Sequence, residues 1–177
     1  MRKSNKWMIV LMLGVFMMAC CGCRNSNDIE DSSYILAMGF EKINDKYLVR
    51  YSYADFDNQK GNSGTKIPSK SITFFAASLK DANRIWESQQ MKRLNFGHLK
   101  VVVFGSNTRN KKIIRELLNH PQIAKSVFVL DSKHTINEVF SEEKNLSVSF
   151  GEYMAKAIEN SDKIKTPKNY TLGRILY

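Results

Sequence analysis

The stretches LKVVVF at 99–104 and SVFVL at 126–130 decide the fold, because both are β-branched runs typical of buried strands. Between them, residues 109–119 carry apolar side chains at the spacing of one helix face, and Pro121 follows. A strand, an amphipathic helix and a second strand in this order form a βαβ unit. Such a unit has parallel strands and a right-handed crossover. The sequence therefore predicts that 99–104 and 126–130 pair in parallel.

The segments upstream and downstream of this unit complete the predicted fold. An apolar stretch at 34–40 and an alternating stretch at 47–54 flank the turn pair Asn44-Asp45, which indicates an antiparallel hairpin. A further strand is expected at 71–76. Helices are expected at 79–90 and 147–159, with a short helical turn near 135–140. The predicted class is α/β (mixed α+β): a mixed sheet of about five strands with an N-terminal hairpin, a βαβ unit and flanking helices.

Composition excludes several classes of protein. The chain has 177 residues, of which 43% are hydrophobic, and its ten Phe and seven Tyr supply enough apolar area for one folded core. A disordered polar tail is therefore excluded. A disulfide scaffold is excluded too, because the three cysteines, at positions 20, 21 and 23, lie within four residues near the N-terminus.

The first 23 residues indicate an export signal. Arg2, Lys3 and Lys6 precede an apolar run at 7–19, which is short for a membrane-spanning helix but typical of a secretory signal peptide. Small residues stand directly before Cys20 and Cys23, as in a bacterial lipobox, whose cysteine receives a diacylglyceryl group. The apolar-apolar-small pattern favours Cys20. We expect a signal peptide and lipobox at 1–23, a polar tether at 24–32 and one globular domain at 33–177.

The rest of the chain offers no catalytic or metal-binding constellation, so we expect neither an enzyme nor a cofactor. The three histidines, His98, His120 and His134, have no partner at metal-ligand spacing. The segment 105–108 (GSNT) lacks the second glycine and the lysine of a phosphate loop, which favours simple helix capping. Basic residues outnumber acidic ones by 27 to 17, but they are spread along the chain. This distribution favours proximity to anionic lipid headgroups over nucleic-acid binding.

Several segments together resemble the Ger(x)C family, the lipoprotein C subunits of nutrient germinant receptors in endospore-forming bacteria. The similarity lies first in GCRN at 22–25 and DIED at 28–31, and next in ILAMGFEK at 35–42, where Glu41 replaces the usual Asp. The most distinctive segment is RLNFGHLKVVV at 93–103, which is similar to the family's Phe-(Gly/Ser)-His-Leu-Lys motif before a β-branched strand. The resemblance covers the family's N-terminal domain and favours Cys23 as the lipidated residue.

The resemblance implies a non-enzymatic lipoprotein on the outer face of the spore inner membrane, beside A-type and B-type membrane subunits of a germinant receptor. Family members continue into a C-terminal domain, so a truncated or separately encoded N-terminal domain is expected. The alternative from another class is an extracytoplasmic solute-binding lipoprotein of an importer, which usually needs two lobes. For Gly97 and His98 we expect a structural role: a special backbone conformation at Gly97 and a loop hydrogen bond from His98.

Overall fold

The structure, a computed structural model, describes residues 32–54, 69–90, 92–161 and 167–175, together with Trp7 and Met12. Cys20 and Cys23, the rest of the expected signal peptide and nearly all of the expected tether lie outside the described residues. In the described part of the chain, no helix is long and apolar enough to cross a membrane.

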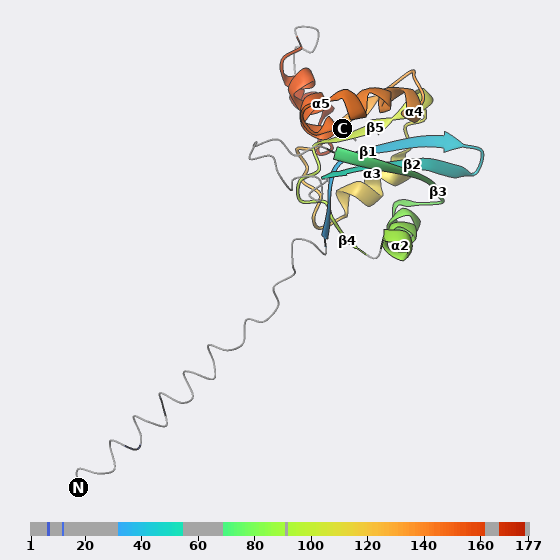
Figure 1. The fold of residues 1–177 in the computed structure, drawn as a ribbon. Helices are drawn as coiled ribbons and strands as arrows, with labels where there is room; N and C mark the ends of the chain where they lie inside the picture. Colours follow the sequence, from blue (N-terminus) through green and yellow to red (C-terminus); the bar gives the residue numbers. More distant parts are fainter. Residues whose placement is uncertain are drawn as a thin grey trace.

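A mixed sheet forms the centre of the domain, with the strand order β3-β2-β1-β5-β6 and with β4 paired to the start of β1 (Figure 1). The strands are β1 (Ser32–Ile43), β2 (Lys46–Ala54), β3 (Ser69–Ala76), β4 (Arg93–Asn95), β5 (Val101–Phe104) and β6 (Phe128–Asp131). Antiparallel pairs join β1 to β2 and β2 to β3, whereas β1, β5 and β6 pair in parallel. The predicted mixed fold, its hairpin and its parallel pair are confirmed.

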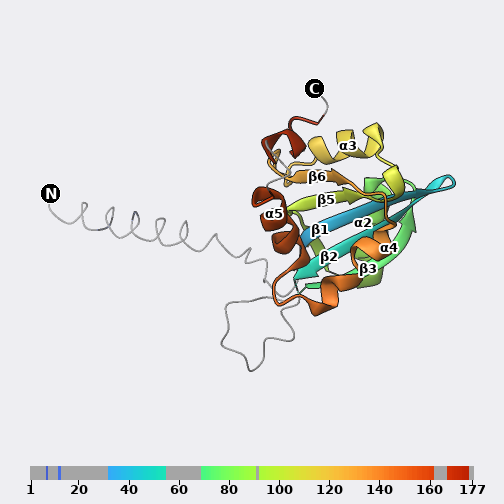
Figure 2. The same cartoon turned by 90° about the horizontal axis from the view of Figure 1, so that it is seen from above.

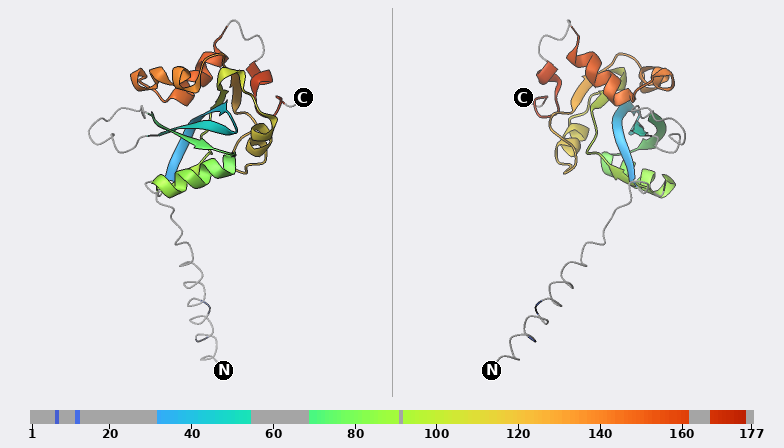
Figure 3. Two further views of the ribbon diagram at one scale, coloured as in Figure 1. Left: turned by 90° about the vertical axis from the view of Figure 1, so that its right-hand side faces the viewer. Right: turned by 60° about the vertical axis from the view of Figure 1, so that its left-hand side comes forward.

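Helices cover both faces of the sheet, which makes three layers. On one face lie α2 (Leu79–Gln90) and α3 (Lys111–Leu118), and on the other lie α4 (Ile136–Val139) and α5 (Phe150–Glu159). Figure 3 (left) shows the green α2 beneath the sheet and the orange helices above it. Two separate apolar clusters result, one on each face.

The interior strand β5 explains why two clusters form. All four of its residues are buried. Because successive side chains of a strand point to opposite faces, Val102 and Phe104 join the cluster under α2 and α3. Val101 joins the cluster under α4 and α5. Because helices cover both faces of β5, each of its side chains must be apolar, and this explains why the run at 101–104 shows no alternation with polar residues.

One local expectation was wrong, and one short strand was not predicted. The segment 105–108 does not cap α3, because the side chain of Asn110 accepts the hydrogen bond from the Lys112 N–H. Instead, Ser106 and Asn107 take left-handed φ angles of 51° and 55° and turn the chain away from β5. The strand β4 was not predicted, since three residues are too few to show an alternating pattern, and it forms by pairing with Ser32–Tyr34.

The parallel strands begin at one end of the sheet, and the chain enters the domain there at Ser32. Figure 2 shows α5 at this end and the β1–β2 turn at the opposite end. At the outer side of β6, Thr171 bridges to Phe128, and the Leu172 N–H donates to the Val127 carbonyl at 2.7 Å. The C-terminal segment therefore covers the edge of the sheet next to β6, which limits pairing with other chains.

Candidate functional site

The segment Phe96–Lys100 forms a tight turn before β5. The Leu99 N–H donates to the Phe96 carbonyl at 3.0 Å, and both side chains are buried. The exposed tip of the turn carries Gly97, His98 and Lys100. The backbone of Lys100 donates to the Leu36 carbonyl at 3.0 Å and accepts from the Phe128 N–H at 2.9 Å. The turn thus connects β1, β5 and β6 at the end where they begin.

Phe96 anchors this turn in the core. Its ring makes edge contacts with Tyr51 and with His120, at centroid distances of 6.1 Å and 4.8 Å. Its N–H donates to the side-chain carbonyl of Gln122 at 3.2 Å. Tyr51 is fully buried, and its hydroxyl donates to Asn83 Oδ1 at 2.8 Å. The aromatic part of the motif therefore has a packing role.

Gly97 and His98, the two residues singled out from the sequence, lie next to each other on the exposed tip. The φ of Gly97 is outside the left-handed region, so the special backbone conformation expected there is not required. A Cβ at Gly97 would meet only the Asn95 side chain, at 3.2 Å, and Gly97 N–H donates to that side chain. His98 packs its imidazole against Tyr34, with ring centroids 5.7 Å apart. Both residues remain accessible to solvent.

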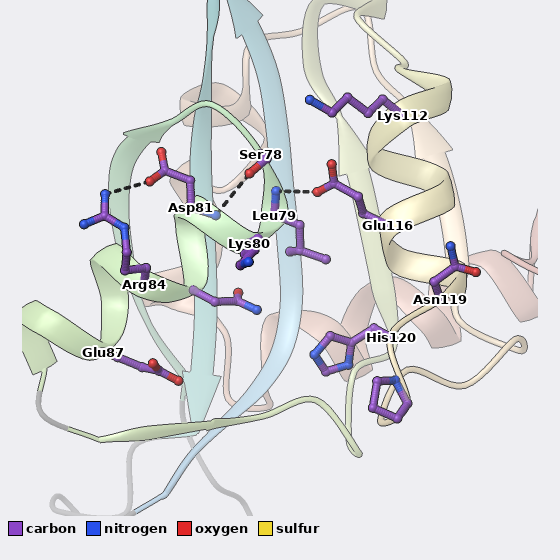
Figure 4. A pocket seen from close by; sticks show the side chains of 12 residues that line it. Ser78, Leu79, Lys80, Asp81, Arg84, Glu87, Lys112, Glu116, Asn119 and His120 are labelled. Atoms are coloured by element: carbon purple, nitrogen blue, oxygen red, sulfur yellow. Dashed lines mark hydrogen bonds and ion pairs between the residues drawn. The ribbon is translucent and has the colours of Figure 1, made fainter.

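A groove of about 900 Å³, lined by several charged residues, runs between α2 and α3 (Figure 4). Three of its charged side chains, Asp81, Arg84 and Glu116, interact with neighbouring protein groups. Glu116 of α3 accepts a hydrogen bond from the Leu79 N–H at 2.7 Å and so caps α2 across the groove. Asp81 forms an ion pair with Arg84 at 2.9 Å. The Glu116 contact joins α2 to α3, whereas the Asp81–Arg84 pair lies within α2.

His120 lies at one end of this groove and is half-buried. Its Nδ1 accepts a hydrogen bond from the Gln122 N–H at 3.3 Å, which requires that nitrogen to be unprotonated. Burial lowers the pKa of His120 below its ordinary value. The neutral imidazole is therefore the form that the fold favours.

We expect the free energy of unfolding to fall as the pH drops below about 6.5, the ordinary pKa of histidine in an unfolded chain. In that window the unfolded chain binds a proton at residue 120 that the folded chain does not bind, so lower pH favours unfolding. The stability that neutral His120 contributes is fully present above the unfolded pKa and is lost as the pH falls below it. Urea unfolding at several pH values measures the slope. His120→Gln should flatten it, whereas His98→Gln, at an exposed histidine, should not. A slope that His120→Gln leaves unchanged would contradict this assignment.

In the described part of the chain, the buried acidic residues are Glu41 and Glu143. Glu41, which ends the apolar part of β1, accepts from Ser106 Oγ at 2.5 Å and from the Ile136 N–H at 2.9 Å. It thereby joins the loop after β5 and the start of α4 to the central strand. This residue belongs to the 35–42 segment quoted for the family resemblance, and its role inside the domain is structural.

The second buried carboxylate, Glu143, accepts hydrogen bonds from Ser52 Oγ and, at 2.9 Å, from Ser69 Oγ. Arg50 approaches it at 3.7 Å and lies over the Phe140 ring. Burial lowers the pKa of Arg50, and the negative charge of Glu143 opposes that shift. Sequence analysis missed this network, because its members come from segments far apart in the chain with no shared motif.

Within the ranges that the structure describes, no three His, Cys, Asp or Glu side chains lie close enough together to hold a metal ion. Gly97 and His98 are consecutive residues and lie at the end of the sheet where β1 begins. The cysteine cluster that precedes β1 in the chain lies outside the described residues.

Comparison with models of protein families gives a match. Residues 25–177 match the model of the spore germination protein N-terminal domain, and this range contains the strands and helices named above. Searches of the curated proteins and of the solved structures found no match. Since the match covers most of the chain and agrees with the segments quoted above, the chain belongs to the family of the spore germination protein N-terminal domain.

Proposed function

We propose that this chain is a lipid-anchored, non-enzymatic subunit of a spore nutrient germinant receptor. It acts beside A-type and B-type membrane subunits on the outer face of the spore inner membrane. The observation that carries the proposal is the family match, which begins at residue 25, directly after the cysteine cluster. If one of these cysteines is the lipidated N-terminal residue of the mature protein, the family domain follows it within a few residues.

The start of β1 supports a position close to the membrane. If Cys23 carries the lipid, residues 24–31 separate it from Ser32, the first residue of β1. The nine Cα–Cα steps from Cys23 to Ser32 span at most about 32 Å in an extended chain. Two acyl chains on one cysteine hold a protein firmly, whereas one chain binds only reversibly. The domain would therefore stay within a short distance of the lipid headgroups.

The polar groups inside the domain support a binding or scaffolding role. Glu41 and Glu143 both hold parts of the fold together through their hydrogen bonds. Glu116 caps a neighbouring helix. Because these carboxylates already accept hydrogen bonds from the protein, a role in assembly of the receptor fits the domain better than a catalytic role.

We expect the chain to incorporate labelled palmitate when it is expressed in a bacterium that processes lipoproteins. Cys23→Ala should abolish the label if the family alignment identifies the lipidated residue, and Cys20→Ala should do so if the lipobox pattern identifies it. Cys21→Ala serves as the matched control and should keep the label. Label that persists in the double variant Cys20→Ala/Cys23→Ala would exclude both cysteines as the lipidated residue, and a wild-type chain that takes up no label would contradict the lipid anchor.

The receptor role is tested in spores. Deleting the gene should slow the loss of refractility in response to at least one nutrient, and expression of the wild-type chain should restore it. Neighbouring reading frames for an A-type and a transporter-like B-type protein would support the assignment. Normal germination combined with defective uptake of a nutrient by growing cells would instead favour the solute-binding lipoprotein of an importer.

A further inference from the structure

The two edge strands of the sheet differ in what covers them. At β6, the C-terminal segment supplies a bridge from Thr171 and a hydrogen bond from the Leu172 N–H. At the opposite edge, β3 pairs with β2 on one side and with no strand of the described part of the chain on the other (Figure 2). An edge strand of this kind offers its backbone to another chain, so natural proteins usually protect it.

The hydrogen bonds of the hairpin show which backbone groups of β3 point outward. The Lys42 N–H points away from β2, because it donates to Thr108 Oγ1. Since the bonding side alternates along a strand, the odd-numbered residues of β1 near the turn bond β2, and the even-numbered residues of β2 opposite them bond β1. The odd-numbered residues of β2 then bond the even-numbered residues of β3. Thr73 and Phe75 therefore direct their N–H and C=O groups outward, and these groups have no hydrogen-bond partner among the described residues.

The second half of β3 is the open part of this edge. The first residue of the strand, Ser69, donates to Glu143 and accepts from the Phe150 N–H, so other segments of the domain lie against it. Residues 72–76 have the sequence ITFFA, without a charged residue or a proline. Charges and prolines are the devices that keep an edge strand from pairing. Aromatic and β-branched residues favour extended structure, so this stretch is suited to bind a further strand.

Apolar side chains lie beside the open half of β3. Phe75 is opposite Leu48 in the register, and Leu48 is opposite Glu41, whose carboxylate contacts the start of α4. Ile43 follows Glu41 by two residues and therefore lies on the same face. Phe75 remains 51% exposed and Ile43 remains 38% exposed, so α4 leaves this end of the face uncovered. We call residues 72–76, together with Ile43 and Leu48, the edge patch.

The size and the chemistry of the edge patch fit a single extended segment. A standard interface between two folded proteins takes about 20–30 residues from each side. The edge patch has far fewer, so two copies of the chain joined through it alone would associate only weakly. Lipid chains would cover the apolar side chains, but they have no groups that bond the N–H and C=O of Thr73 and Phe75. An extended peptide covers the side chains and bonds the backbone as well.

We propose that the edge patch binds an extended segment of a partner protein, which adds to β3 as a further strand. The segment pairs its backbone with Thr73 and Phe75, and every second side chain is apolar and packs against Ile43 and Leu48. The inference rests on the proposed function in one respect, since the partner is then an A-type or B-type membrane subunit. The edge patch lies at the end of the sheet with the β1–β2 turn, away from Ser32. A lipid anchor before Ser32 therefore leaves it accessible.

The test uses the full-length chain in spores and a photoreactive residue, benzoylphenylalanine. It is placed at position 43 in the edge patch or, as a control, at position 115, where Arg115 is exposed on α3. Irradiation should link position 43 to an A-type or B-type subunit, identified by mass spectrometry of the linked peptides. The linked peptide should have apolar residues at alternate positions. Position 115 should give no such link.

Two substitutions at Thr73 separate the role of the backbone from that of the side chain. Thr73→Pro removes the outward N–H, and an edge strand accepts proline there because this N–H does not bond β2. It should lower the yield of the link at 43 by roughly five- to tenfold, the effect of losing one hydrogen bond. Thr73→Val keeps the N–H and should leave the yield unchanged. Thermal melts check that the variants are folded, and Phe75→Lys, at an exposed side chain, should lower the yield even if Thr73→Pro does not fold.

The outcomes separate this proposal from the proposed function. Equal yields for Thr73→Pro and Thr73→Val, with both variants folded, overturn the added strand. A link from 43 to a second copy, or to residues 55–68 of the same chain, overturns it too, because the edge patch would have another occupant. No link in spores whose germination requires this chain overturns the docking surface and leaves the receptor role intact. A link to an importer subunit that Thr73→Pro weakens would contradict the receptor role and support the added strand.

Discussion

Replacing Gly151 by alanine should destabilise the domain by about 2–3 kcal/mol, the cost of forcing an extra methyl group into a packed interior. Gly151 lies in the first turn of α5, where the helix crosses β1. An ideal Cβ there would lie 2.7 Å from the Leu36 carbonyl carbon and closer still to its oxygen. Because these are backbone atoms of the central strand, the helix has to move. Phe150 and Ile158, which α5 buries, would then lose contact with the sheet.

The sign of this effect makes the prediction informative. In an exposed helix position, alanine is more favourable than glycine by about 1 kcal/mol. Contact with β1 should reverse that preference at Gly151. Urea unfolding monitored by circular dichroism measures the difference. Gly97→Ala is the control, because its Cβ would meet only a side chain, at 3.2 Å, and the change should stay within about 0.5 kcal/mol of wild type. A Gly151→Ala variant as stable as wild type would show that α5 does not pack as described.

Replacing Glu143 by alanine should cost about 3 kcal/mol of stability at neutral pH, in the range expected when one member of a buried ion pair is removed. The carboxylate is 2% exposed and the Arg50 side chain is 17% exposed, so solvent replaces little of what is lost. Ser52 and Ser69 would also lose the acceptor of their hydroxyl hydrogen bonds. A buried donor without an acceptor is costly in its own right.

The adjacent residue supplies the matched control. Glu142 is exposed and accepts a hydrogen bond from the nearby Asn145. Glu142→Ala should therefore change stability by less than about 0.5 kcal/mol. Replacing Arg50 and Glu143 together by leucine should recover part of the loss, because no unpaired charge would remain. Equal unfolding midpoints for Glu142→Ala and Glu143→Ala would contradict the structural role given to the network.

The βαβ unit was predictable because its signals are local. Two short β-branched runs and one amphipathic segment, 109–119, each carry their own periodicity. The parallel pairing of β5 with β6 then follows from the handedness of crossover connections. The Asn44-Asp45 turn was predictable for the same reason, and Asn44 has the positive φ of 55° that asparagine tolerates.

Features that depend on the three-dimensional surroundings of a residue could not be predicted from the sequence. Gly97 was expected to take a special backbone conformation, yet its φ is not left-handed. No pattern around Gly151 indicates its role, although its missing side chain is what allows α5 to approach Leu36. The difference is physical: a close approach between a helix and a strand depends on how two separate segments pack, and neither segment records that distance in its own pattern.

The functional features divide along the same line. The apolar run at 7–19 and the cysteines at 20, 21 and 23 indicate export and lipidation from the linear sequence, because the processing machinery acts on an extended segment. The buried acceptors Glu41 and Glu143 required the tertiary structure. Glu143 and its partners Arg50, Ser52 and Ser69 are far apart in the chain and share no motif. They meet only because β2 pairs with β3 and the segment Ser141–Asn145 packs against β3.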